Sequence, residues 1–150
     1  GSLGGLYKRR GQFDLAKDAY RRGGKVTPHS SYTFMNLAVL EMNDGRRDEM
    51  LRAFQHVERV ARAETQAHAG NYYGLADLMT AQLALGKSDD AQDTMLALFE
   101  MAPEAENVLD LEIDTLRRML EALGGADAAP HVASAIARIE AEMARRAEEG

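Results

Sequence analysis

The sequence contains no cysteine and no tryptophan, has only three prolines, and carries few aromatic residues, at 6% of its 150 positions. Without cysteine, the chain has neither disulfide bonds nor thiolate-based sites, and its redox compartment stays open. No apolar run reaches the length that crosses a bilayer, so we expect no membrane-spanning segment. The scarcity of isoleucine and aromatic residues favours helix over strand.

The two ends of the chain look engineered. Gly1-Ser2 resembles the residues that tag cleavage leaves behind, and Glu149-Gly150 has a similar character. We therefore expect a piece of a longer protein, from which a targeting signal could have been removed. The cytoplasm is our expectation for its location.

The residues that are abundant favour helices. Hydrophobic residues make up 45% and charged residues 28% of the chain, which is typical of soluble globular proteins. The apolar residues are mostly Ala, Leu and Met, which share high helix propensity with Glu and Arg. Since no segment alternates with a period of two, we predict an all-α fold without a sheet, in one domain over residues 1–150.

Charge is distributed unevenly along the chain. Residues 1–64 carry 12 Lys and Arg against 8 Asp and Glu, whereas residues 65–150 carry 6 against 16. This asymmetry fits either ordinary solvated helix faces or the steering of a partner. It is also compatible with a weak homodimer in which the basic part of one copy meets the acidic part of another.

Three glycines mark a repeat. Gly11 and Gly45 are 34 residues apart, and Gly45 and Gly86 are 41 apart, so seven residues are inserted around 65–71. Small or apolar residues follow each glycine after five and nine positions: Ala16 and Tyr20, Met50 and Phe54, Ala91 and Met95. Each unit therefore predicts two amphipathic helices joined by a tight turn, where glycine takes the left-handed conformation that ends a helix.

Local signals support these helices. Ser30 or Ser31 offers an N-cap to the first helix of the second unit, and Ser88 offers one in the third unit. Asp89 and Asp90 follow Ser88 in the first turn, where the helix dipole favours anions. The second helix of the second unit has one apolar stripe, made of Met50, Phe54, Val57 and Ala61.

Residues 106–148 predict a divergent helix pair. Its first helix ends at Gly124-Gly125 and has an apolar face of Val108, Leu109, Ile113, Leu116, Leu120 and Leu123. Its second helix begins near Asp127 and Pro130, with an apolar face of Val132, Ile136, Ile139 and Met143. Because the last turns are polar, we expect this pair to cap an array of repeats.

No catalytic, metal or cofactor site is indicated. The four histidines show no pairing at metal-ligand spacing: His29, His56, His68 and His131. No serine has a recognisable base, and nothing suggests that the pair Asp110 and Asp114 is desolvated for acid–base work. Basic residues before position 30 make nucleic acid a rival partner, but the sequence pI of about 5.2 opposes it. We predict no enzymatic activity, no cofactor, no metal and no nucleic-acid partner.

The units resemble the tetratricopeptide repeat family, whose repeat is about 34 residues long. The first unit matches best, at Leu3, Gly4, Tyr7, Gly11, Ala16, Tyr20 and Pro28. The second departs from the pattern at Glu41, Met50 and Arg62, and the third at Gln82 and Met95. The resemblance implies a right-handed α-α superhelix with helix pairs at about 3–30, 31–64 and 72–105, capped by 106–148. It also implies a non-enzymatic scaffold that binds another protein.

In the resembled family, the first helices of successive repeats line a concave groove that receives a peptide. Carried over by position, the groove residues are Tyr32, Met35, Asn36, Val39, Met42, Tyr73, Asp77, Thr80, Leu83, Asp110 and Asp114. We expect the apolar ones to form an exposed strip, unless a neighbouring helix or the insertion covers part of it. The implied partner is an apolar helical or extended segment with a basic flank. A structural, self-associating segment of a larger solenoid is the alternative.

Family members that bind acidic chaperone C-termini are similar in a clamp of Lys, Asn and Arg. This sequence keeps only Asn36 of that clamp, and the remaining clamp positions are Gly1, Gly5, Tyr73 and Asp77. Because Asp77 would repel a terminal carboxylate, we predict that such acidic tails do not bind.

Overall fold

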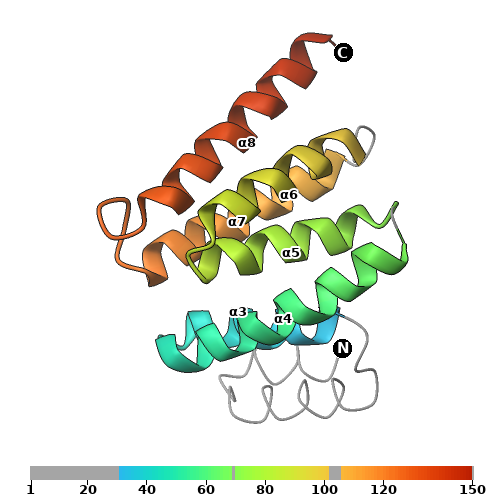
Figure 1. Cartoon of the computed structure of the whole chain (residues 1–150). Helices are drawn as coiled ribbons and strands as arrows, with labels where there is room; N and C mark the ends of the chain where they lie inside the picture. Colours follow the sequence, from blue (N-terminus) through green and yellow to red (C-terminus); the bar gives the residue numbers. More distant parts are fainter. Residues whose placement is uncertain (1–30, 69, 102–105, 150) are drawn as a thin grey trace.

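The computed structural model describes residues 31–68, 70–101 and 106–149, with the side chains of residues 32, 33, 106 and 107 left out. Within these ranges all regular structure is helical, in six helices and no strand. Figure 1 shows them as α3 (Ser31–Asn43), α4 (Arg47–Ala67), α5 (Tyr72–Ala84), α6 (Ser88–Met101), α7 (Glu106–Ala122) and α8 (Pro130–Glu149). The predicted all-α class is confirmed for this part of the chain. The predicted unit at 3–30 lies outside the described residues.

The glycine-marked helix ends form as predicted. After α3, Gly45 has φ +73°, its N–H donates to the Met42 carbonyl at 3.2 Å, and the Arg46 N–H donates to the Glu41 carbonyl at 3.1 Å. This pair of bonds is the Schellman arrangement, which satisfies carbonyls that the end of a helix leaves unpaired. The same two bonds recur after α5 at Gly86 and after α7 at Gly124.

The helix starts agree less closely with the prediction. Pro130 is the first residue of α8, and Asp89 and Asp90 lie in the first turn of α6, as expected. Ser31 differs: its hydroxyl and its N–H both donate to carboxylates of other helices, and the N–H reaches Glu64 Oε1 on α4 at 2.7 Å. A carboxylate from a neighbouring helix thus satisfies the Ser31 N–H at the start of α3.

The seven-residue insertion lengthens α4. This helix has 21 residues, compared with 13 in α3, 13 in α5 and 14 in α6. A short connection follows, in which the Asn71 side chain caps α5 by accepting the Gly74 N–H at 3.0 Å. The insertion therefore extends one helix without disturbing the next pair.

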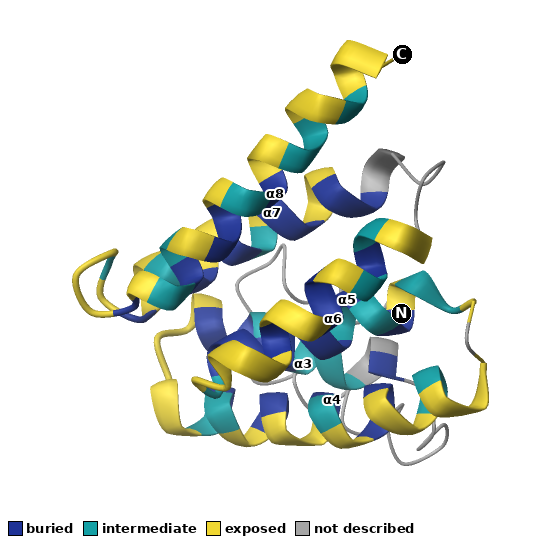
Figure 2. Ribbon diagram, turned by 45° about the horizontal axis from the view of Figure 1, so that its top comes forward, coloured by how far each residue is buried: buried dark blue, intermediate teal, exposed yellow. Residues whose placement is uncertain are grey.

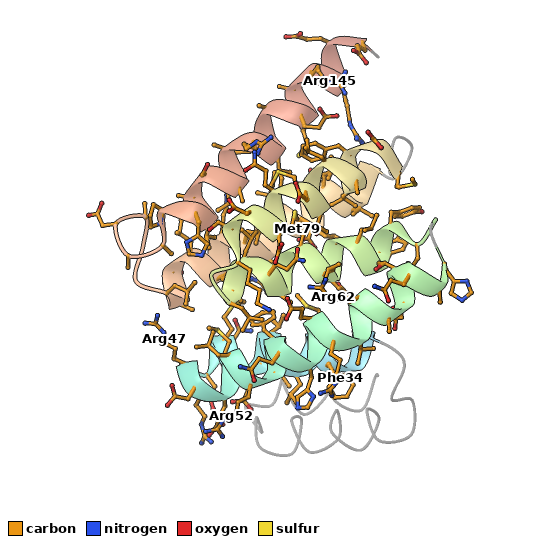
Figure 3. All side chains as sticks on the ribbon, viewed as in Figure 1. Phe34, Arg47, Arg52, Arg62, Met79 and Arg145 are labelled. Atoms are coloured by element: carbon orange, nitrogen blue, oxygen red, sulfur yellow. The ribbon has the colours of Figure 1, made fainter. Side chains whose placement is uncertain are left out.

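Consecutive helices pack against each other around one core. α3 packs on α4, α4 on α5, α5 on α6, and α7 on α8. The predicted stripe of α4 is buried, and the fully buried alanines Ala38, Ala61 and Ala91 allow helices to approach closely. Met79 of α5, labelled in Figure 3, is fully buried within this stack.

The first helix of each predicted pair meets the others along one side of the molecule. α7 contacts both α3 and α5, and α3 also contacts α5. In Figure 1, α3 lies behind α4, and α7 lies behind α6. Any groove between α3 and α5 is therefore partly covered by α7.

The end of α8 extends away from the rest of the molecule. Figure 2 shows burial decreasing toward its C-terminus, and residues 147–149 are exposed. A hydrogen bond holds the C-terminal part of α8 to α6, because Arg146 Nη2 donates to the Phe99 carbonyl at 2.7 Å. No helix within the described ranges is both long enough and apolar enough to span a bilayer.

Candidate functional site

A cleft of about 390 Å³ opens where α3, α5 and α7 meet. Its walls combine apolar and polar side chains from all three helices: Met35, Asn36, Val39, Tyr73, Ala76, Asp77, Val108, Leu111, Glu112 and Thr115. Clefts of this size, mainly apolar with a few convergent polar groups, are typical of binding sites. This cleft is the strongest candidate site in the described part of the chain.

Five of the groove residues predicted from the sequence line this cleft: Met35, Asn36, Val39, Tyr73 and Asp77. They come from two helices that are far apart in the sequence, so the helical register carried over from the resemblance placed them on a common surface. Tyr32 belongs to α3, but its side chain lies outside the described residues.

Three other predicted groove residues are buried. Met42, Thr80 and Leu83 are 5%, 0% and 3% exposed, so the expectation that they line an open groove is wrong. For Thr80 and Leu83 the reason is that later helices cover the C-terminal half of α5, whereas Met42 belongs to α3 and is part of the core. Glu112 of α7 lies against Thr80, and His131 Nε2 of α8 lies 2.8 Å from the Leu83 carbonyl oxygen.

Asp110 and Asp114 lie on another surface. Both are exposed and line a separate hollow of about 530 Å³ between α7 and α8, where Asp114 pairs with Arg118 at 3.2 Å. The sequence placed them in the same groove as Asp77, and the structure separates them from it. Leu111 lines both hollows and so stands on the ridge between them.

Two large apolar side chains at the cleft are exposed to solvent. Tyr73 of α5 is 59% exposed and Leu111 of α7 is 62% exposed. In the described residues only two other large hydrophobic side chains are exposed, Leu96 and Met101 of α6, and neither lines this cleft. Met35 and Val39 are half-buried beside them, so the cleft presents a local concentration of apolar surface.

Two of the polar groups of the cleft are poorly solvated acids, Asp77 and Glu112. The Ser31 hydroxyl donates to Asp77 Oδ2 at 2.8 Å and also lies 3.3 Å from Glu64 Oε2. Burial raises the pKa of Asp77 to about 6, which the Ser31 hydrogen bond opposes and the charge of Glu64 reinforces. Burial raises the pKa of Glu112 to about 8, with Thr80 opposing the rise and Asp77 reinforcing it. At neutral pH, Asp77 is therefore mainly charged and Glu112 mainly neutral.

The contacts of Thr80 agree with a neutral Glu112. Thr80 Oγ1 lies 2.8 Å from the Ala76 carbonyl oxygen and 2.5 Å from Glu112 Oε2. The hydroxyl has one proton, which it donates to Glu112 when that carboxylate is charged. When Glu112 is protonated, it can donate to Thr80 instead, and the hydroxyl proton is then free for the Ala76 carbonyl. Glu112 was not among the residues predicted from the sequence, although its spacing of four residues from Val108 and from Leu116 places it on the buried face of α7.

No positive charge balances these acids within the described residues. None of the ion pairs formed there by Lys and Arg involves Asp77, Glu112 or Glu64. In the same ranges, no group of three or more His, Asp and Glu side chains has an arrangement that could hold a metal ion. The cleft is therefore apolar at its rim and acidic where it is least exposed.

No family model matches the chain, and a search of curated proteins finds no match either. A function can therefore be inferred only from the residues and their geometry.

Proposed function

We propose that this chain is a non-catalytic protein-binding module, and that the cleft between α3, α5 and α7 receives a segment of a partner polypeptide. The observation that carries the proposal is the exposure of Tyr73 and Leu111 on two helices that line one apolar cleft. Aromatic and large aliphatic side chains that remain exposed around a concavity are typical anchors of protein interfaces.

We further propose that the helices form a short tetratricopeptide-like solenoid. Three features support this: α3 and α5 are each followed by a partner helix, both end at a Schellman glycine, and α7 ends in the same way. In such an array the first helices of successive pairs share one face. α7 contacts both α3 and α5, so the proposed groove is shorter than an open solenoid would offer.

The experiment is a selection of short random peptides on the purified chain, followed by affinity measurements on the selected sequences. We expect Tyr73→Ala and Leu111→Ala each to weaken binding by about 1–2 kcal/mol, which is roughly 5- to 30-fold. Leu96→Ala is the matched control, since Leu96 is 48% exposed on α6 and does not line the cleft. Equal losses in all three variants would argue against the cleft, and a peptide that binds only in the presence of Leu96 would place the site on α6.

A further inference from the structure

We propose that the partner inserts a Lys or Arg side chain, flanked by apolar residues, into this cleft beside Asp77 and Glu112, and that the cation enters in exchange for the proton held by Glu112. The inference rests on the proposed function and names the chemistry of the segment that binds.

The arrangement of carboxyl groups supports a cationic occupant. Asp77 of α5 and Glu112 of α7 both line the cleft, and Asp77 shares the Ser31 hydroxyl with Glu64 of α4. These three acids come from three helices: Ser31 joins Asp77 to Glu64, and Glu112 bonds with Thr80. Charges buried in proteins are normally paired, and no Lys or Arg among the described residues pairs with these acids. A cation from outside would supply the opposite charge.

The apolar walls of the cleft suit the aliphatic part of a Lys or Arg side chain. Lys and Arg have long aliphatic stems that pack along apolar surface while the charged end reaches polar groups. Met35, Val39 and Leu111 provide that surface, and the ring of Tyr73 can attract a cation. The same acids would repel phosphate groups and carboxylates, which argues against a nucleic acid or an acidic tail as the occupant.

The release of a proton on binding follows from the charge states of Asp77 and Glu112. With the cleft empty at neutral pH, the Glu112 carboxylic acid is protonated and the Asp77 carboxylate is charged, since burial raises the two pKa values to about 8 and about 6. A cation beside the two groups stabilises their charged forms and lowers both pKa values. Glu112 then loses its proton to solvent as its carboxylate pairs with the ammonium or guanidinium group. Binding should therefore release a proton near neutral pH and strengthen as the pH rises from about 6 to about 8.

Two other acids belong to the network around Glu112 in the described residues. Asp77 faces it from α5, and Glu64 reaches the same network from α4 through Ser31 of α3. Tyr73 is the remaining titratable side chain in the lining, and no charged residue of α3 lines the cleft. α8 packs on α7 at the neighbouring hollow, where Glu140 pairs with Arg117 at 3.3 Å.

The test uses peptides selected on the wild-type chain from a random library, each made again with Arg replaced by citrulline or Lys by norleucine. We expect the selected sequences to contain a Lys or Arg next to apolar residues, and the neutral versions to bind at least about tenfold more weakly. Calorimetry near neutral pH, in two buffers with different ionisation enthalpies, should show a proton released on binding of the cationic peptide. Between low and high pH, the total rise in affinity should be about tenfold for each unit by which the cation lowers the pKa of Glu112.

Two variants complete the test. Glu112→Gln keeps the shape and the donor to Thr80 but has no proton to release, so proton release and the pH dependence of affinity should both diminish. Glu121→Gln, an exposed glutamate on the same helix, should retain both.

Peptides that bind in a Tyr73-dependent way but without a cation, or without proton release, would overturn the inference and leave the proposed function standing. A library that yields no Tyr73-dependent peptide would overturn both.

Discussion

Glu112 should make the fold less stable as the pH rises. In the unfolded chain its pKa is near the ordinary value of 4.5, and in the folded chain burial raises it to about 8. Between these values the folded state binds one more proton than the unfolded state. The free energy of unfolding therefore falls by roughly 1.4 kcal/mol per pH unit over this window. The stabilising effect of the neutral acid is complete below pH 4.5 and is lost as the pH rises through about 8.

The variant Glu112→Gln isolates this effect, because the amide is neutral at every pH and can still donate to Thr80. From about pH 5 to about pH 8, at roughly 1.4 kcal/mol per unit, the free energy of unfolding of the variant should rise by about 4 kcal/mol relative to that of the wild type. Urea denaturation followed by circular dichroism, at several pH values from about 5 to about 8, measures the difference. Glu121→Gln, exposed on the same helix, should stay within about 0.5 kcal/mol of the wild type. A constant difference between Glu112→Gln and wild type across the range would show that Glu112 is not held in its neutral form.

The remaining predictions concern packing, backbone and ligand preference. Ala91→Leu should lower the thermal stability by about 1–3 kcal/mol, because Ala91 is fully buried in α6; an unchanged melting temperature would disprove the packing described. Gly86→Ala should lower the free energy of unfolding, measured by urea denaturation, by about 1 kcal/mol, because φ is +77° at this position. Gly70→Ala is the control and should change it little, because Gly70 has open space around it and no left-handed backbone. Equal effects of the two substitutions would contradict the conformational explanation. An acidic chaperone C-terminal peptide should show no binding by calorimetry, because Asp77 repels its carboxylate, and micromolar affinity would contradict the charge assigned to the cleft.

The sequence predicted the helices because their signals are local. Glycines at 45 and 86 adopt positive φ and end α3 and α5, and the apolar stripe of α4 is buried at Met50, Phe54 and Val57. Each of these features depends only on residues within a few turns of one helix.

The sequence prediction of the groove was only partly right, because the groove depends on how distant helices meet. Met42 and Leu83 were expected on an open surface, but the structure buries them in the core. One signal could have revealed this for Leu83: from Ala76 to Ala84, α5 has small or apolar residues on nearly all sides, which is typical of a helix surrounded by others. No periodicity within one helix predicts that α7 contacts both α3 and α5.

The buried acids could have been found in part. Asp77 was noted for its charge, but its partner Ser31 lies 46 residues away and Glu64 belongs to another helix. Such a network arises only when the helices pack. Glu112, in contrast, interrupts an apolar face of α7, and an acid at such a position signals either a buried partner or a site.

A decisive measurement locates the surface of the wild-type chain to which a selected peptide binds. Methyl NMR spectra recorded during a peptide titration would report on Met35, Val39 and Leu111 inside the cleft, and on Leu96 of α6 outside it. We expect saturable shifts of the three cleft methyl groups, with the signals of Leu96 unmoved. Shifts confined to Leu96 and its surroundings, with the cleft methyl groups unchanged at saturation, would contradict it.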